Sequence, residues 1–182
     1  MNLIGNLLIA PPAVKNTFWH KTVILVTEHN VAGSMGLVLN KASTLSINDF
    51  GYQLGYALDQ EGWVYMGGPV DIKNLSYLHT SEWTSINTMR VNDKLSISSA
   101  EDILPRMADG DMPHSWRICL GVCGWAAGQL EAELKGIAPW KKESAWCTAT
   151  GDLELIFGSS GADQWCNALD RSGLEFAQNM LL

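Results

Sequence analysis

An uninterrupted apolar run near the N-terminus constrains the fold more than any other feature of the chain. Residues 22–27 read Thr-Val-Ile-Leu-Val-Thr, so four consecutive side chains in the middle of the run are apolar and none of them is polar. A strand with one wet face alternates apolar and polar residues, whereas a strand covered on both faces does not. The run therefore predicts a central strand that other elements bury on both sides.

Further short apolar and β-branched runs predict strands over 36–40, 63–66, 75–78, 116–120 and 153–157. The link at 30–33 is rich in turn-forming residues and predicts a hairpin between the first two strands.

Helical spacing and capping residues predict four helices among these strands. The first is expected after Ser46, with Asp49 three residues further on. The second is expected after Ser98 or Ser99, with Glu101 and Asp102 in its first turn and a kink or early end at Pro105. The third is expected over 128–135, and the fourth after Ser160, ending before Gly173. Strands and helices are mixed without strict alternation, which favours an α+β or irregular α/β fold over a doubly wound nucleotide-binding fold. The length of 182 residues, without repeats or long linkers, predicts a single domain over 1–182.

Four segments with unusual residue combinations occur in order along the chain. They lie at 7–12 with 18–23, at 28–30 with 33–41, at 67–70 with 78–79, and at 120–134. The last is the most specific and reads Leu-Gly-Val-Cys-Gly-Trp-Ala-Ala-Gly-Gln-Leu-Glu-Ala-Glu-Leu. Together with Trp165 and Ala168-Leu169 nearer the C-terminus, these segments resemble the AlgH/YqgE family from about Leu7 to Leu174.

The resemblance implies a bifurcated β-sheet curled into a pseudo-barrel with helices packed around it, and it implies no settled activity. Some relatives are described as transcriptional regulators on genetic grounds, which does not establish contact with DNA. This chain has Cys123 where the family usually has an aromatic residue and Lys21 where it usually has arginine. A role for Cys123 would therefore be particular to this protein.

The charge balance argues against two classes of partner. The formal net charge is −7, and the only adjacent basic pair, Lys141-Lys142, is followed directly by Glu143. An acidic protein without a basic stripe repels nucleic-acid phosphates and anionic membrane surfaces, so we expect neither direct nucleic-acid binding nor membrane binding. The first ten residues contain no basic residue, and their apolar run is too short for a membrane helix, so we expect a cytoplasmic protein.

The four cysteines do not form a recognisable disulfide framework. Cys119 and Cys123 invite a redox interpretation, but on one extended strand they would lie about 13 Å apart, whereas a disulfide needs Cα atoms within about 7 Å. They could meet only if the chain bends sharply at Gly121. We therefore expect buried free thiols.

The segment Glu28-His29-Asn30 is the first candidate site, because three polar residues leave a buried strand and enter a turn. His29 could act as a general base near neutral pH. The structural alternative is that Glu28 and Asn30 bond the turn backbone while His29 packs at the rim of the barrel.

The second candidate is Gly67-Gly68-Pro69, which follows a strand and lies upstream of His79. A glycine-rich loop that binds phosphate ends in lysine followed by serine or threonine, and this segment lacks that ending. A tight turn that redirects the sheet is therefore favoured. His79 could face the same cleft as His29. Two histidines without a third ligand do not make a metal site, so we expect no metal and no cofactor.

The third candidate is the strand, small-residue turn and helix start at 121–131. Gly124 would give access to backbone N–H groups at the helix start, and Gln129 and Glu131 could line a site with Glu133. The alternative is close packing of strand on helix with Trp125 filling the core. Glu131 and Glu133 lie two residues apart and cannot face the same way on a helix.

These observations leave three functional hypotheses. The first is a non-enzymatic ligand- or protein-binding regulatory domain with an indirect role in transcriptional regulation, because no complete catalytic or metal set is found. The second is an enzyme, a hydrolase or group transferase, that uses His29 in a cleft beside 121–131; it requires His29 within about 10 Å of that segment. The third is direct DNA binding, against which the charge argues.

Overall fold

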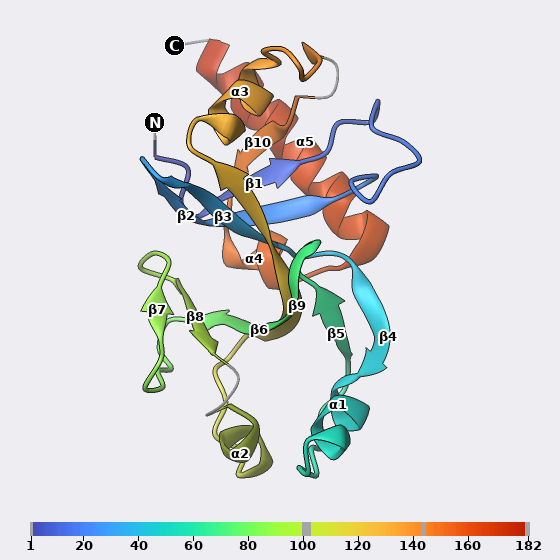
Figure 1. Cartoon of the computed structure of the whole chain (residues 1–182), viewed down its shortest axis with the longest axis vertical. Helices are drawn as coiled ribbons and strands as arrows, with labels where there is room; N and C mark the ends of the chain where they lie inside the picture. The colour runs from blue at the N-terminus through green and yellow to red at the C-terminus, as the bar shows by residue number, and fades with distance from the viewer. Residues whose placement is uncertain (1, 100–102, 143–144, 181–182) are drawn as a thin grey trace.

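The computed structural model describes residues 2–99, 103–142 and 145–180. Its strands are β1 (Asn6–Ile9), β2 (Val23–Asn30), β3 (Gly33–Val38), β4 (Ala42–Ser46), β5 (Trp63–Met66), β6 (Val70–Thr80), β7 (Met89–Arg90), β8 (Leu95–Ser99), β9 (Trp116–Ala126) and β10 (Cys147–Thr150). Its helices are α1 (Ile47–Gln53), α2 (Ile103–Ala108), α3 (Gln129–Lys135), α4 (Leu153–Phe157) and α5 (Gly161–Met180) (Figure 1).

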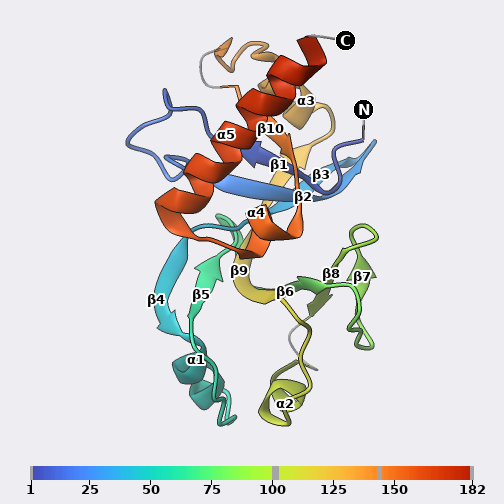
Figure 2. The same cartoon turned by 180° about the vertical axis from the view of Figure 1, so that it is seen from behind.

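The strands form one forked sheet in the order β10-β1-β2-β3-β9-β6-β8-β7, and β4 and β5 branch from it. The fork is at β9. Its second half pairs antiparallel with β3, while its first half pairs antiparallel with β6 and, at Cys119 and Leu120, parallel with β5. The sheet is strongly curled into a half-barrel, with α5 across the β1–β2–β10 end and α1 and α2 at the other end (Figures 1 and 2). The α+β class and the forked, curled sheet expected from the sequence are confirmed.

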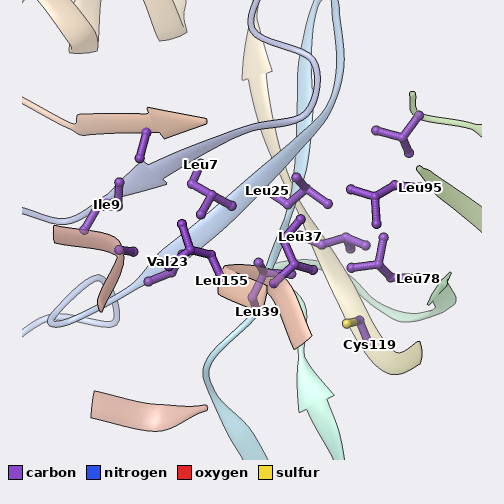
Figure 3. Packing of buried hydrophobic residues seen from close by; sticks show 14 of the residues in the cluster. Leu7, Ile9, Val23, Leu25, Leu37, Leu39, Leu78, Leu95, Cys119 and Leu155 are labelled. Atoms are coloured by element: carbon purple, nitrogen blue, oxygen red, sulfur yellow. The ribbon is translucent and has the colours of Figure 1, made fainter. Parts of the chain in front are cut away.

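Both faces of β2 are covered, as its apolar run predicts. Val23 and Leu25 belong to a cluster with Leu7, Leu155 and other residues beneath α4 and α5 (Figure 3). Ile24 and Val26 point to the opposite face, where they pack with Trp125 and Leu130 beside α3. All four central residues of the run are fully buried. The hairpin predicted at 30–33 is also present, with Asn30 paired to Gly33.

Two predictions for the C-terminal part of the chain are wrong, and local hydrogen bonds explain both. Residues 153–157 form α4 and not a strand, because the Asp152 carboxylate accepts a 2.8 Å hydrogen bond from Leu155 N and so caps a helix. The last helix passes through Gly173 and ends at Met180. Beyond Gly173, the Glu175 carboxylate accepts a 3.0 Å hydrogen bond from Thr150 N on β10, which holds the second half of the helix against the sheet.

The other helix predictions are confirmed in part. Ser46 Oγ accepts a 3.0 Å hydrogen bond from Asp49 N at the start of α1. Helix α3 begins after Gly128 and ends at Gly136, as expected. Helix α2 begins at Ile103 and is short, with Pro105 in its first turn, where its missing N–H is not needed.

The predicted start of α2 does not hold. Ser98 and Ser99 belong to β8 and therefore do not begin a helix. Glu101 and Asp102 lie outside the described residues.

The sheet can fork because two backbone segments approach each other closely at glycine residues, which have no side chains. Gly67 and Gly68 connect β5 to β6 and cross β9 at Gly121, whose φ is 75°. A Cβ at Gly68 would lie 2.1 Å from the carbonyl carbon of Val122, and one at Gly67 would lie 2.4 Å from the Gly121 oxygen. Gly67 N donates a 2.7 Å hydrogen bond to Leu120 O, so the link is held directly on β9. This geometry corresponds to a turn that redirects the sheet.

We expect Gly68→Ala to destabilise the protein by about 3 kcal/mol or more, because the added methyl group meets backbone that cannot rotate away. Gly173→Ala is the matched control. It lies inside α5 with nothing within 4 Å of the added Cβ, so it should stabilise the protein by up to about 1 kcal/mol. Urea unfolding followed by circular dichroism measures both changes. Equal stabilities for the two variants would contradict the crossing described above.

Candidate functional site

A pocket of about 470 Å³ lies between β9, α3 and two loops, one before β2 and one before β10. Four of its walls are indole rings, supplied by Trp19, Trp125, Trp140 and Trp146. Its polar lining includes Gln129 and Glu133. The volume, and a lining that combines aromatic and other apolar residues with a few polar groups, are those of small-molecule sites. The pocket lined by these tryptophan and polar residues is called the tryptophan pocket below.

The local fold positions the two polar residues that α3 contributes to the tryptophan pocket. Gly128 adopts a left-handed conformation (φ 73°) that turns the chain from β9 into α3. Gln129 and Glu133 follow four residues apart, so they share one face of α3. Gln129 Oε1 accepts a 3.0 Å hydrogen bond from Ala126 N, which fixes the amide at the turn. One backbone N–H of this turn, that of Ala126, is thus already satisfied by Gln129.

The Glu133 carboxylate is the centre of the hydrogen bonding in the tryptophan pocket. Its Oε2 accepts from Trp125 Nε1 at 3.0 Å and from Trp146 Nε1 at 2.8 Å, and its Oε1 accepts from Gln129 Nε2 at 2.9 Å. Trp19 packs edge-on against Trp146, with ring centroids 5.7 Å apart. One half-buried carboxylate therefore orients two indole rings and, through Trp146, contacts a third.

Sequence reasoning found part of the tryptophan pocket. Gly124 and Gln129 belong to it as proposed. Trp19, Trp140 and Trp146 were missed, because they come from loops that no spacing rule connects to α3. Glu133, considered from the sequence as polar lining beside Gln129, also lines the pocket, one helical turn after Gln129.

His29 lies beside the 121–131 segment, so the geometric condition for the enzyme hypothesis is met. Its Nε2 is 3.7 Å from Glu131 Oε1, and its Nδ1 is 2.8 Å from Ser34 Oγ. The side chain of His29 is 11% exposed and that of Glu131 is 43% exposed. Ser34 was not considered from the sequence, although the hairpin register places it directly opposite His29. Ser34 itself is buried.

The neighbours of His29 in sequence do not join it. Asn30 Oδ1 accepts a 2.8 Å hydrogen bond from Ala32 N, as a turn-bonding residue does. Glu28 is half-buried and lines a separate cleft of about 350 Å³ together with Met35 and Ser98. Because successive residues of a strand face opposite sides, Glu28 and His29 belong to different surfaces.

His79 is fully buried and does not join His29. Its Nδ1 is 2.9 Å from Thr80 O, so this nitrogen carries the proton, and its Nε2 accepts a 2.9 Å hydrogen bond from Ser98 Oγ. Burial lowers the pKa of His79, which keeps the imidazole neutral. Gly67 and Gly68 lie at the crossing with β9, away from both histidines' hydrogen-bond partners.

All four cysteines are free, and burial raises the pKa values of Cys119 and Cys123 to about 12. The Cys123 thiol also donates to Gly67 O at 3.6 Å. The prediction of buried free thiols is confirmed for this pair. Within the described ranges, no three His, Cys, Asp or Glu side chains gather as metal ligands would. None of the helices in those ranges has the length and apolar character needed to cross a membrane.

These differences in burial predict the reactivity of the thiols. With Ellman's reagent at pH 8, we expect one fast equivalent from the exposed Cys166, a slower one from half-buried Cys147, and none from Cys119 or Cys123 until the protein unfolds. The Cys166→Ser variant should lose the fast phase and keep the rest of the profile. A fast reaction at Cys123 would contradict the described burial.

Comparison with known proteins gives a consistent family. The family model described as AlgH-like (DUF179) matches residues 7–177. A UPF0301 protein of Thiobacillus denitrificans is 32% identical over 181 residues; the match covers 97% of this chain and 94% of that protein. The UPF0301 protein PBPRA3139 of Photobacterium profundum is 32% identical over 182 residues; the match covers 96% of this chain and 94% of that protein.

Two solved structures have the same fold. The solution structure of AlgH from Pseudomonas aeruginosa matches with a TM-score of 0.75 and 32% identity, over 94% of this chain and 89% of that one. The crystal structure of DIP2367 from Corynebacterium diphtheriae matches with a TM-score of 0.70 and 19% identity, over 92% and 85%, and shows likeness of fold alone. With its sequence matched over 7–177 and its forked half-barrel shared, the chain belongs to the AlgH-like family.

Proposed function

We propose that this protein is a non-enzymatic ligand-binding domain and that its ligand occupies the tryptophan pocket. The observation that carries the proposal is the arrangement of four indole rings around one oriented carboxylate in a hollow of about 470 Å³. Indole rings provide a large apolar contact area at a small cost in side-chain entropy, and a few fixed polar groups provide orientation.

The walls of the pocket are held in place before any ligand arrives. Trp125 belongs to a buried cluster with Leu8, Ile24 and Val26, and Trp19 and Trp146 pack against that cluster. Rigid walls reduce the entropy that binding would otherwise cost. Two groups in the lining that could react are held in unreactive states. Burial raises the pKa of the Cys123 thiol, so the thiol stays protonated, and the Glu133 carboxylate already accepts three hydrogen bonds. These features favour recognition over chemistry.

A regulatory role would follow from ligand binding. The pocket is bordered by α3 and by the loop before β10, and α5 packs directly on β10. Occupancy of the pocket can therefore alter a surface that a protein partner contacts. On this proposal, any effect on transcription is indirect and passes through such a partner.

A fragment titration followed by NMR tests the proposal. The eight tryptophans give separate indole N–H signals, and a bound aromatic fragment should shift those of Trp19, Trp125, Trp140 and Trp146. The indole signals of the other tryptophans serve as the internal control. Trp140→Ala should weaken binding by about tenfold, because one wall is lost. If fragments shift only the control signals, or none, the pocket is not a binding site.

A second candidate function is hydrolysis or group transfer with His29 as the base, and one arrangement favours it. The imidazole lies between the Ser34 hydroxyl and the Glu131 carboxylate, the order of nucleophile, base and orienting acid. Glu131 is partly exposed while Ser34 is buried, so this candidate requires the substrate carbonyl to reach a buried hydroxyl.

Hydrolysis of p-nitrophenyl acetate tests this second candidate. On this proposal the protein turns the ester over, and His29→Ala lowers the rate at least about a hundredfold, because proton transfer in the transition state is lost. The control is His114→Ala, which removes an imidazole that is 88% exposed and whose Nδ1 lies 3.0 Å from Glu82 Oε1. Equal rates for the His29 and His114 variants would eliminate the enzyme hypothesis.

A further inference from the structure

We infer that the tryptophan pocket takes an organic cation, a molecule with an ammonium group next to an apolar or aromatic body. The inference deepens the proposed function and rests on it. It concerns the charge of the ligand, which the proposed function leaves open. The argument has three parts: the missing countercharge of Glu133, the character of the walls, and the field around the pocket.

The first part is that Glu133 has hydrogen-bond donors but no countercharge. Its three donors are two indoles and one amide, all of them neutral. Within the described part of the chain, the ion pairs involve other carboxylates, and no Lys, Arg or His nitrogen lies within 4.0 Å of Glu133. A half-buried carboxylate in such surroundings is stabilised by a cation brought in from outside.

Glu133 also has the hydrogen-bonding capacity to receive that cation. Oε2 accepts two hydrogen bonds, whereas Oε1 accepts only one, from Gln129. Each carboxylate oxygen has two lone pairs, so Oε1 can accept a further N–H without displacing either indole. The ligand nitrogen would therefore lie on the Gln129 side of the carboxylate.

The second part is the chemistry of the walls. The faces of aromatic rings carry negative electrostatic potential and attract cations, and indole does so more strongly than phenol or benzene. Four of the chain's eight tryptophans line this one pocket. Such walls favour an ammonium ion over a neutral molecule of the same shape and disfavour a carboxylate.

The third part is the field around the pocket. The formal net charge of −7 attracts cations over long range. Among the described residues that line the pocket, Lys15 is the one basic residue, and it is exposed. Its ammonium would repel a cationic ligand and attract an anionic one. Removing the charge of Lys15 therefore gives opposite results for the two kinds of ligand.

Calorimetric titration with three nearly isosteric probes tests the inference at pH 7 and low salt. The probes are phenethylammonium, neutral 2-phenylethanol and anionic phenylacetate. We expect phenethylammonium to bind about tenfold or more tighter than 2-phenylethanol, and phenylacetate to bind most weakly. The tighter binding of the cation should decrease as salt is added, because screening weakens its interaction with Glu133.

Two variants assign the preference to the pocket. Glu133→Gln should remove most of the cation's advantage over 2-phenylethanol, and Lys15→Met should raise the affinity for the cation severalfold. Asp59→Asn is the matched control for lost negative charge. Asp59 is exposed and lies in the segment after α1, at the opposite end of the molecule from α3 (Figure 1), so the variant should leave the cation affinity unchanged.

The outcomes separate the inference from the proposed function. If 2-phenylethanol binds as tightly as the cation, or if phenylacetate binds best and Lys15→Met weakens it, the pocket is a binding site but the cation inference is wrong. If none of the three probes binds and no fragment shifts the pocket indoles, both proposals fail. Glu133 orients two indole rings, so the Glu133→Gln variant can disturb them. If Glu133→Gln does not fold, the effect of Lys15→Met on the affinity for the cation decides whether the cation inference holds.

Discussion

The fold depends on one close contact between two backbones, where Gly67 and Gly68 cross β9 at Gly121. At this point the sheet forks, because β9 can pair with β6 and β5 in its first half and with β3 in its second half only if no side chain separates the strands. The second half of β9 then carries Trp125 to the buried cluster beside α3. The position of the tryptophan pocket thus follows from a contact made at the fork.

A buried arginine holds the other half of β9. Arg117 is almost fully buried and donates hydrogen bonds to Leu39 O, to Gln164 Oε1 at 2.9 Å and to Ser159 O at 2.6 Å. These partners lie just after β3, in α5 and just before α5, so one guanidinium joins the fork of the sheet to the helix that covers it. Its donors are used on carbonyl and amide oxygens, whose hydrogen bonds stabilise a charge that burial would otherwise disfavour. The two ends of β9 therefore differ: one anchors the fold and the other forms the pocket.

The parts of the fold that local chemistry decides could be predicted from the sequence. The apolar run at 22–27, the Ser46 cap and the glycines around α3 each act over a few residues, and all three predictions are confirmed. Residues 153–157 were predicted wrongly because a short apolar run is compatible with either a strand or a helix, and the Asp152 cap decides between them. The enzyme hypothesis required His29 near 121–131, and the structure places it beside Glu131. The tryptophan pocket as a whole was not predicted, since Trp19 and Trp146 lie more than a hundred residues apart in the chain and meet only after the sheet has closed.

The central claim is that a tryptophan-lined pocket containing the Glu133 carboxylate receives the ammonium end of a ligand. A crystal structure of the protein with phenethylammonium tests it most directly. We predict the ligand nitrogen within hydrogen-bond distance of Glu133 Oε1 and within about 6 Å of an indole centroid. A well-ordered ligand bound elsewhere, or one whose nitrogen points out of the pocket towards solvent, would contradict the account.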